Sequence, residues 1–221
     1  MGVKSMVKIK NALTLTAVGG VWLYMVYVLV FWGPMGVGYW HYMVAMTTPQ
    51  DQKKEHLRQS VEWWRWAAER GNVLAMYQVG LAYQKGEGVE QDPQQAVTWL
   101  RRAGDEGNVP AMILMADAYY TGDGVETDPR QAVAWLLQAA EQEDTEAMYR
   151  VGDAYRIGYG GTKDYSKALY WSRRAADKGN YGAMLNMERI YEEGLGVPKD
   201  KKLAKEWHDK AKQLEHSLPQ Q

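Results

Sequence analysis

The 221-residue chain contains no cysteine, and this absence removes several kinds of chemistry at once. A disulfide framework, a thiolate metal site, a cysteine nucleophile and a lipid anchor attached to cysteine are all excluded. The sequence also has no Asn-x-Ser/Thr glycosylation signal. The missing cysteines suit an oxidising compartment, and the missing glycosylation signal favours a bacterial periplasm over the lumen of the endoplasmic reticulum.

Recognisable catalytic and metal-binding motifs are missing as well. No Gly-x-Ser-x-Gly sequence occurs, and none of the four histidines is paired with another at the i, i+4 spacing of a helical metal site. The four Gly-x-Gly sequences follow expected helices rather than strands, so we expect helix stops and tight turns instead of phosphate-binding loops. The sequence therefore predicts no catalytic residue, no cofactor and no metal site.

The balance of charge argues against a nucleic-acid partner. The chain has 26 Lys and Arg residues against 27 Asp and Glu residues. Three of these lysines, Lys4, Lys8 and Lys10, lie at the N-terminus, which leaves 23 basic against 27 acidic residues elsewhere. Surfaces that bind nucleic acid are strongly basic, so this mildly acidic remainder indicates another kind of partner.

No charged residue occurs between Asn11 and Trp40. Within this stretch, residues 12–32 are mostly Leu, Val, Ala and aromatic residues, and a helix of that length spans roughly 30 Å, one bilayer core. The N-terminal lysines precede the segment, and the next basic residue is Lys53. This asymmetry predicts a single-pass inner-membrane protein with a cytoplasmic N-terminus and a periplasmic remainder. The aromatic residues expected at the far interface are Trp32, Tyr39, Trp40 and Tyr42.

A cleaved signal peptide is the alternative interpretation of this segment. Its apolar run is longer than a signal-peptide core, and the small-residue sequences at 36–38 and 44–46 are poor cleavage sites. We favour a retained anchor in contact with the lipid bilayer, followed by a break at Gly33-Pro34 and one continuous helix from about 49 to 70. The expected organisation is a cytoplasmic tail (1–11), a transmembrane helix (12–32), a linker (33–48) and a repeat domain (49–216).

The remainder of the chain repeats itself every 36 residues. The segment GEGVEQDPQQAVTW at 86–99 returns as GDGVETDPRQAVAW at 122–135. Tryptophan recurs at this spacing without a slip, at Trp63, Trp99, Trp135, Trp171 and Trp207. Chance does not preserve such a spacing, so the chain is an array of structural units.

Each unit reads as two helices. Apolar residues at 96, 99, 100 and 103 mark one helix face, and Asp92-Pro93 supplies an N-cap followed by proline at the first helical position. The second helix begins after Asn or Asp and stops at a Gly-x-Gly sequence. Helices are predicted at 59–70, 74–85, 93–106, 110–121, 129–142, 146–157, 165–178, 182–193 and 201–215. The units are about 59–94, 95–130, 131–166 and 167–202, with a capping helix at 203–215.

The stretch AAERGNVLAMYQVGLAYQKGEGVEQDPQQAVTW, which begins at Ala67, resembles the Sel1-like repeat, a relative of the tetratricopeptide repeat. The resemblance covers residues 59–214 and implies an all-α fold: an α/α solenoid superhelix, here preceded by one transmembrane helix. Three positions depart from the pattern, namely Glu143, Gly161 and Glu188. Members of the family resemble adaptors and scaffolds without a shared reaction.

The resemblance also implies that the first helices line a concave, protein-binding face. The residues expected on that face, as partner-binding candidates, are Glu62, Arg65, Trp66, Thr98, Arg101, Arg102, Gln138, Tyr170, Arg173 and Arg174. A simpler interpretation assigns the arginines to i, i+4 salt bridges with the row at 69, 105, 141 and 177. Trp66 either binds a partner or packs on the helix over 49–58 or on the linker, and both interpretations stay open.

The predicted function is that of a membrane-anchored scaffold, without enzyme activity, that holds another protein in the groove of the solenoid. Two alternatives remain open. The first is an immunity or inhibitor protein that neutralises a toxin acting on the cell envelope, and the second is a cell-wall hydrolase, which requires clustered carboxylates or a serine–base pair.

Overall fold

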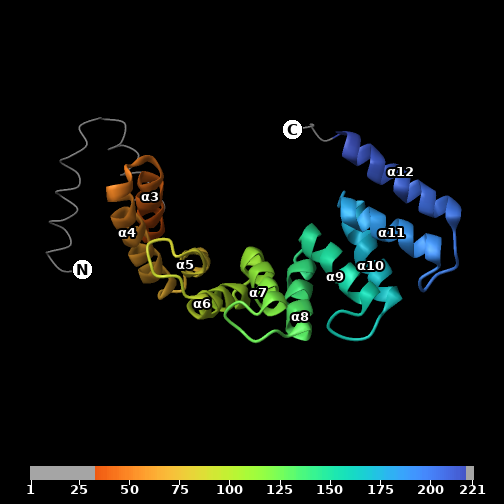
Figure 1. Cartoon of the computed structure of the whole chain (residues 1–221), viewed down its shortest axis with the longest axis horizontal. Coiled ribbons are helices and arrows are strands. Elements are labelled where there is room, and N and C mark those ends of the chain that lie inside the picture. Colours follow the sequence, from red (N-terminus) through yellow and green to blue (C-terminus); the bar gives the residue numbers. More distant parts are fainter. Residues whose placement is uncertain (1–32, 218–221) are drawn as a thin grey trace. The chain divides into compact units, whose positions relative to one another are not determined.

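The computed structural model describes residues 33–217, and these fold into ten α-helices without a strand (Figure 1). The helices are α3 (Gly33–Thr47), α4 (Gln50–Ala68), α5 (Val73–Lys85), α6 (Pro93–Asp105), α7 (Val109–Thr121), α8 (Pro129–Glu141), α9 (Thr145–Ile157), α10 (Tyr165–Asp177), α11 (Tyr181–Glu193) and α12 (Lys201–Ser217). The expected tail (1–11) and transmembrane helix (12–32) lie outside the described residues. Among residues 33–217, no helix combines the length and apolar character needed to cross a bilayer.

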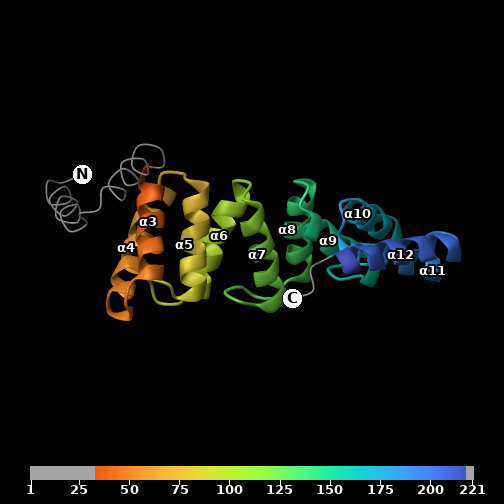
Figure 2. The same cartoon turned by 90° about the horizontal axis from the view of Figure 1, so that it is seen from above.

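The chain divides into two compact units at Gln91–Asp92, and each is described separately. In the described part of the first unit, α4 packs against both α3 and α5 (Figure 2). In the second unit each helix from α6 to α12 packs against the next along the chain, and α9 also contacts α11. Both units therefore have the layered arrangement of helix pairs expected of a repeat array.

The helix ends are those that the sequence predicts. Asp92 caps α6, because its Oδ1 accepts hydrogen bonds from the backbone N–H groups of Gln94 and Gln95, both at 3.0 Å. Asn108 caps α7 in the same way through the N–H of Ala111 at 2.9 Å. The second helices α5, α7, α9 and α11 each end at a glycine in the left-handed conformation. The capping and glycine predictions are confirmed.

Large rings packed on small residues form the core of the second unit. Trp99 and Leu100 are buried on α6, while Ala103 is fully enclosed, as the apolar pattern predicts. Gly104 shows why small residues are needed, because a Cβ built there lies 2.8 Å from the ring of Trp135 on α8. A side chain at position 104 would collide with the ring of Trp135. Glycine there leaves room for this ring of α8 to pack against α6.

The segment 33–48, expected as a linker, is instead helix α3, so that prediction is wrong. Met35 and Ala45 of α3 are buried. A Cβ built at Gly38 would collide with the ring of Trp64 on α4, so the two helices approach closely. Proline in the first turn of a helix is tolerated because the N–H that it lacks has no partner there, so the Gly33-Pro34 pair starts this helix rather than preventing it.

The aromatic residues that follow the proposed membrane segment also have a different role. Tyr39 and Tyr42 on α3 lie against Trp64, with ring centroids 5.6 and 5.7 Å away. The Tyr39 hydroxyl accepts a hydrogen bond from Gln78 on α5 at 2.7 Å. These rings therefore join α3 to the rest of the first unit, and their expected place in a membrane interface stays a prediction.

Two departures from the repeat pattern keep the local geometry. Glu143 occupies a position that is glycine at 71, 107 and 179, and it adopts the same left-handed conformation with φ of 66°. Hydrogen bonding from Lys178 lowers the pKa of the Glu143 carboxyl, and Arg174 pairs with the same carboxylate. At the second departure, Glu188 lies 3.1 Å from His208 of α12, at the position where Gly152 faces Ser172 in the preceding unit. Each substituted side chain has therefore gained a polar partner.

Arginines from first helices hold tyrosines of second helices. Arg101 of α6 donates a hydrogen bond to the Tyr119 hydroxyl of α7 at 2.6 Å. Two 36-residue repeats further along, Arg173 of α10 donates a hydrogen bond to the Tyr191 hydroxyl of α11 at 3.0 Å. Each bond joins two helices that are consecutive along the chain through a charged donor, which strengthens the contact.

We expect Tyr119→Phe to lower the free energy of unfolding by about 1 kcal/mol, because Arg101 loses a hydrogen-bond partner at a half-buried position. Urea unfolding followed by circular dichroism measures the change. The matched control is Tyr155→Phe, at the equivalent position opposite Leu137, where no hydrogen bond involves the hydroxyl in the described structure. Equal losses in both variants would contradict the role given to Arg101.

The left-handed position of Glu143 generates a second stability prediction. Glu143→Ala keeps the strained backbone and loses both cationic partners, whereas Glu143→Gly removes the strain. Glu143→Ala should therefore unfold at a lower urea concentration than Glu143→Gly. Gly107→Ala, at a glycine with φ of 90°, is the control and should cost about 1 kcal/mol. An alanine variant at 143 as stable as the glycine variant would rule out the left-handed conformation.

Candidate protein-binding surface

The ten candidate binding residues lie on first helices, and all are exposed or half-buried. Three of them, Glu62, Arg65 and Trp66, are on α4 of the first unit. The others are on α6, α8 and α10 of the second unit, namely Thr98, Arg101, Arg102, Gln138, Tyr170, Arg173 and Arg174. Their outward orientation agrees with the helical pattern, whereas their role in binding stays a prediction.

Trp66 is the most prominent aromatic residue of the first-unit set. Its side chain is 37% exposed, and its ring lies edge-on to Trp63 with centroids 6.5 Å apart. The guanidinium of Arg70 sits over the ring at 3.8 Å, and Arg70 also donates a hydrogen bond to the Trp66 carbonyl. This cation–π contact fixes the ring on the surface of α4, where it presents one broad apolar face.

The salt bridges expected between the arginine and acidic rows do not form in the described part of the chain. Arg101 and Arg173 bind tyrosine hydroxyls instead of Asp105 and Asp177. Glu62 pairs with Arg58, one turn earlier on α4, and not with an arginine of the candidate row. The carboxylates at 69, 105, 141 and 177 are consequently exposed without an ion-pair partner among the described residues.

Cations cover the repeated tryptophans from three residues further along the same helix. Arg102 lies over the Trp99 ring at 4.5 Å and Lys210 over the Trp207 ring at 4.0 Å. Side chains at i and i+3 are neighbours on a helix, so this contact follows directly from the 36-residue pattern. Trp66 and Gln138 occupy the position of Arg102 in the 36-residue pattern, and neither side chain carries a positive charge.

The densest group in the second unit surrounds Arg174 of α10. Arg174 lies 5.0 Å from the Trp171 ring centroid and donates to the Tyr170 hydroxyl at 3.1 Å. It also pairs with Glu143, which Lys178 approaches at 2.8 Å. Tyr170 itself is 54% exposed. A large aromatic side chain is thus exposed at the surface and hydrogen-bonded to Arg174, which is itself paired with Glu143.

The remaining candidates have weaker local support. Thr98 donates its hydroxyl hydrogen bond back to the Gln94 carbonyl at 2.9 Å, so its side chain is engaged within α6. Gln138 is exposed, with no side-chain hydrogen bond in the described structure. These two residues add polar surface rather than an anchor.

Exposed apolar residues on second helices escape prediction from the sequence. Tyr120 of α7 is 62% exposed and lies 5.5 Å from the Tyr159 ring. Ile157, Tyr181 and Leu185 on α9 and α11 are exposed as well. None of these side chains recurs at the 36-residue spacing, so the repeat pattern gives no signal for them.

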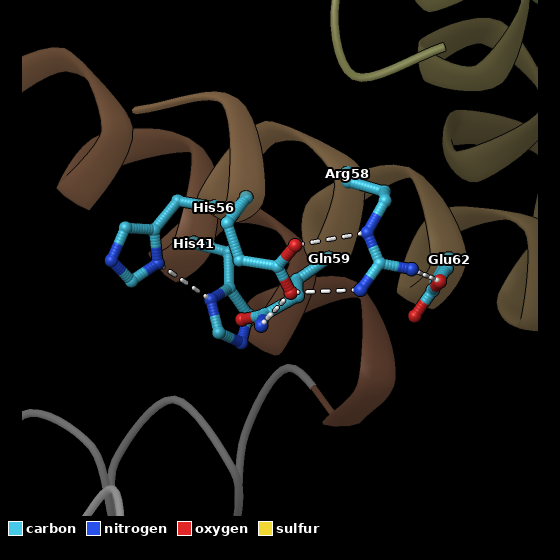
Figure 3. Close-up of polar contacts among 6 residues, drawn as sticks. His41, His56, Arg58, Gln59 and Glu62 are labelled. Atoms are coloured by element: carbon cyan, nitrogen blue, oxygen red, sulfur yellow. Dashed lines mark hydrogen bonds and ion pairs between the residues drawn. The ribbon is translucent and has the colours of Figure 1, made fainter. Parts of the chain in front are cut away.

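Two histidines are also brought together without a sequence signal. The Nδ1 atoms of His41 on α3 and His56 on α4 are 3.3 Å apart (Figure 3). Burial lowers the pKa of His41 to about 4, and the neighbouring His56 adds to the effect. Their separation of fifteen residues in the sequence is meaningful only once α3 is known to be a helix packed on α4.

Comparison with solved structures supports the same architecture. A Sel1 repeat protein from Oxalobacter formigenes matches with a TM-score of 0.74 and 23% identity, over 96% of this chain and 85% of that one. A protective antigen of uropathogenic Escherichia coli that displays an SLR fold matches with a TM-score of 0.72 and 35% identity, over 82% of this chain. The match spans only 38% of the length of the antigen.

An immunity protein from Pseudomonas aeruginosa also matches, over 81% of this chain and 83% of that one. Its identity is 20% and its TM-score 0.41, so this likeness carries no argument about function. No curated protein matches the chain.

The family comparison resolves the number of repeats. The Sel1 repeat model matches five consecutive segments, at 35–72, 73–108, 109–144, 145–180 and 182–216. The first of them covers α3 and α4, so the repeats begin before the expected boundary at 49, and the array has five units instead of four with a cap. With five repeats along most of its length, the chain belongs to the Sel1 repeat family.

Proposed function

We propose that this protein is a non-catalytic scaffold that binds another protein through helices α4, α6, α8 and α10 and holds it at the membrane. Sel1 repeat proteins are typically protein-binding scaffolds, and this chain consists largely of such repeats. The observation that carries the proposal is the presence of rigidly held, exposed aromatic residues beside arginines. Trp66 lies under Arg70 in the first unit, and Tyr170 is bonded to Arg174 in the second.

Rigid placement matters because association costs the side-chain freedom that is lost at the interface. Arg70 and Arg174 already restrict the two rings before a partner arrives, so less entropy remains to be lost. Tryptophan, tyrosine and arginine are also the residue types that dominate binding hot spots. The exposed carboxylates at 105, 141 and 177 lie on the same three helices of the second unit, which suits a partner with a basic rim around an apolar centre.

Alanine substitutions test the surface. We expect Trp66→Ala and Tyr170→Ala each to weaken partner binding by about 10-fold or more, as removal of a hot-spot aromatic does. Partner recovered from detergent extracts of cells carrying each variant, quantified against the unaltered protein, gives the measurement. The matched control is Tyr120→Ala, which removes a tyrosine from α7 that is more exposed than Trp66 or Tyr170.

The controls separate the possible outcomes. Retained binding in Tyr120→Ala with loss of binding in Trp66→Ala or Tyr170→Ala supports the assignment to α4, α6, α8 and α10. Loss of binding only in Tyr120→Ala would place the binding surface on α7 and its equivalents, and would overturn the assignment. Circular dichroism of each variant excludes unfolding as the cause.

Membrane attachment through residues 12–32 is the second element of the proposal. The support is the uncharged apolar sequence itself, preceded by three lysines, which favours a cytoplasmic N-terminus and periplasmic repeats. The first helix of the described structure begins at Gly33, so the repeats would follow the membrane segment without a spacer. A partner bound to α4 would then be held close to the lipid surface.

Fractionation tests the anchor. We expect the full chain to sediment with inner membranes and to resist alkaline extraction, whereas deletion of residues 2–32 should release a folded repeat domain into the soluble fraction. The intact mass of the membrane-bound protein distinguishes an anchor from a cleaved signal peptide. A full-length chain that alkaline treatment extracts completely would contradict the proposal.

A further inference from the structure

A hydrogen bond between two histidines joins α3 to α4 in the first unit (Figure 3). The Nδ1 atoms of His41 and His56 face each other at 3.3 Å, so one ring donates an N–H and the other accepts it with a lone pair. Both side chains are half-buried, and the Trp40 ring lies edge-on to them, with its centroid 4.8 Å from His41 and 6.4 Å from His56. The bond therefore exists only while at least one of the two imidazoles is neutral.

We propose that the bond between His41 and His56 is an acid-sensitive switch, which keeps α3 packed on α4 near neutral pH and releases it when both imidazoles are protonated. With both rings protonated, each Nδ1 carries a hydrogen and neither has a lone pair to accept one. Two positive charges would then face each other in a half-buried contact, which disfavours the packed arrangement. Release of α3 removes this cost, because water then solvates each imidazolium separately.

The surroundings of the pair oppose a second proton. Burial lowers the pKa of His41 to about 4, and the neighbouring His56 adds to the effect, while the Glu55 carboxylate acts in the opposite direction. Glu55 already accepts hydrogen bonds from Arg58 at 2.8 Å and from Gln59 at 2.7 Å (Figure 3). Its negative charge is therefore shared with a cation and offsets the second proton only in part.

The other charged groups near the pair give little compensation. Lys53 precedes His56 by one turn of α4 and adds positive charge. Among the described groups, only the carboxylate of Glu55 favours protonation of His41 electrostatically. The remaining titratable groups on this side of the first unit interact with tyrosines of α3 instead, and they are Tyr77 of α5, which acts on Tyr39, and Glu87 in the turn after α5, which acts on Tyr42. The doubly protonated pair thus lacks a dedicated counter-charge.

Acidification favours release because the released ring binds the proton more tightly. The pKa of an exposed histidine is about 6.5, against about 4 for His41 when α3 is packed. As the pH falls from about 6.5 towards 4, the released form gains a proton that the packed form does not bind, so the packed form is progressively lost. From His41 alone, the equilibrium constant for release should rise by about 30-fold between pH 7.5 and pH 5.

Release of α3 need not disturb the other helices. Among the described residues α3 packs mainly on α4, whereas α4 also packs on α5. In a repeat array each element depends on its neighbours, so one outer helix can open while the others stay folded. Release would place the 15 residues of α3 as a tether between residues 12–32 and α4. This last consequence rests on the proposed membrane anchor, whereas the switch itself does not.

Hydrogen exchange of the full chain in detergent, followed by mass spectrometry at pH 7.5 and pH 5, tests the switch. After correction for the intrinsic exchange rate at each pH, the protection of α3 amides should fall by about 30-fold, while that of α8 should change little. His41→Gln keeps an amide that can donate to or accept from His56 but takes up no proton, so it should remove most of this pH dependence. His208→Gln, which alters a histidine of α12, is the matched control and should retain it.

Four results would overturn the switch. They are α3 protection that does not change with pH, an equal loss of protection in α3 and α8, a pH dependence that persists in His41→Gln, and one that disappears in His208→Gln. If His41→Gln does not fold, exchange of the imidazole C2 hydrogen in the unaltered chain gives the pKa of His41 directly. A pKa well below 6.5 supports the switch, and one near 6.5 overturns it. None of these measurements depends on alkaline extraction or partner recovery, so a failure of the proposed function is distinguishable from a failure of the switch.

Discussion

The fit of a tryptophan ring against a residue with little or no side chain is the contact on which the described structure depends. Trp135 lies where a Cβ on Gly104 would collide with it, and Trp64 has the same relation to Gly38. The ring fills the space between helices, and the glycine or alanine lets the helices approach closely enough to enclose it. The 36-residue spacing repeats tryptophan at 99, 135, 171 and 207 and a buried alanine or glycine at 68, 104, 140 and 176, whereas the contact of Gly38 with Trp64 lies outside this register.

The same tryptophans organise the surface. A ring buried between helices still has one edge near solvent, and the residue three positions later lies above it. Where that residue is Arg102 or Lys210, a cation covers the ring. Where it is Trp66, a second aromatic ring continues outward and is covered in turn by Arg70. The candidate binding anchors are thus extensions of the core pattern onto the exterior.

The sequence predicts the elements that depend on local chemistry. N-caps such as Asp92, glycine stops such as Gly122 and the buried face around Trp99 all follow from residue type and spacing. Helix α3 escapes prediction because its residues are apolar on most sides and continue an uncharged segment, which hides any amphipathic period. The hydrogen bonds of Arg101 and Arg173 also escape, because an acidic residue lies at the expected i+4 position while the actual partner is a tyrosine eighteen residues away.

Contacts between successive helices have a consequence for how the second unit loses its structure. Apart from the contact of α9 with α11, the helices from α6 to α12 pack mainly on their neighbours along the chain. Opening helix α12 therefore removes support mainly from α11, together with the contact of Arg173 on α10 with the Trp207 ring, while the pairs nearer the middle remain intact. Amide protons in this unit should exchange with solvent in a graded order, fastest in α12 and slowest toward the middle of the unit.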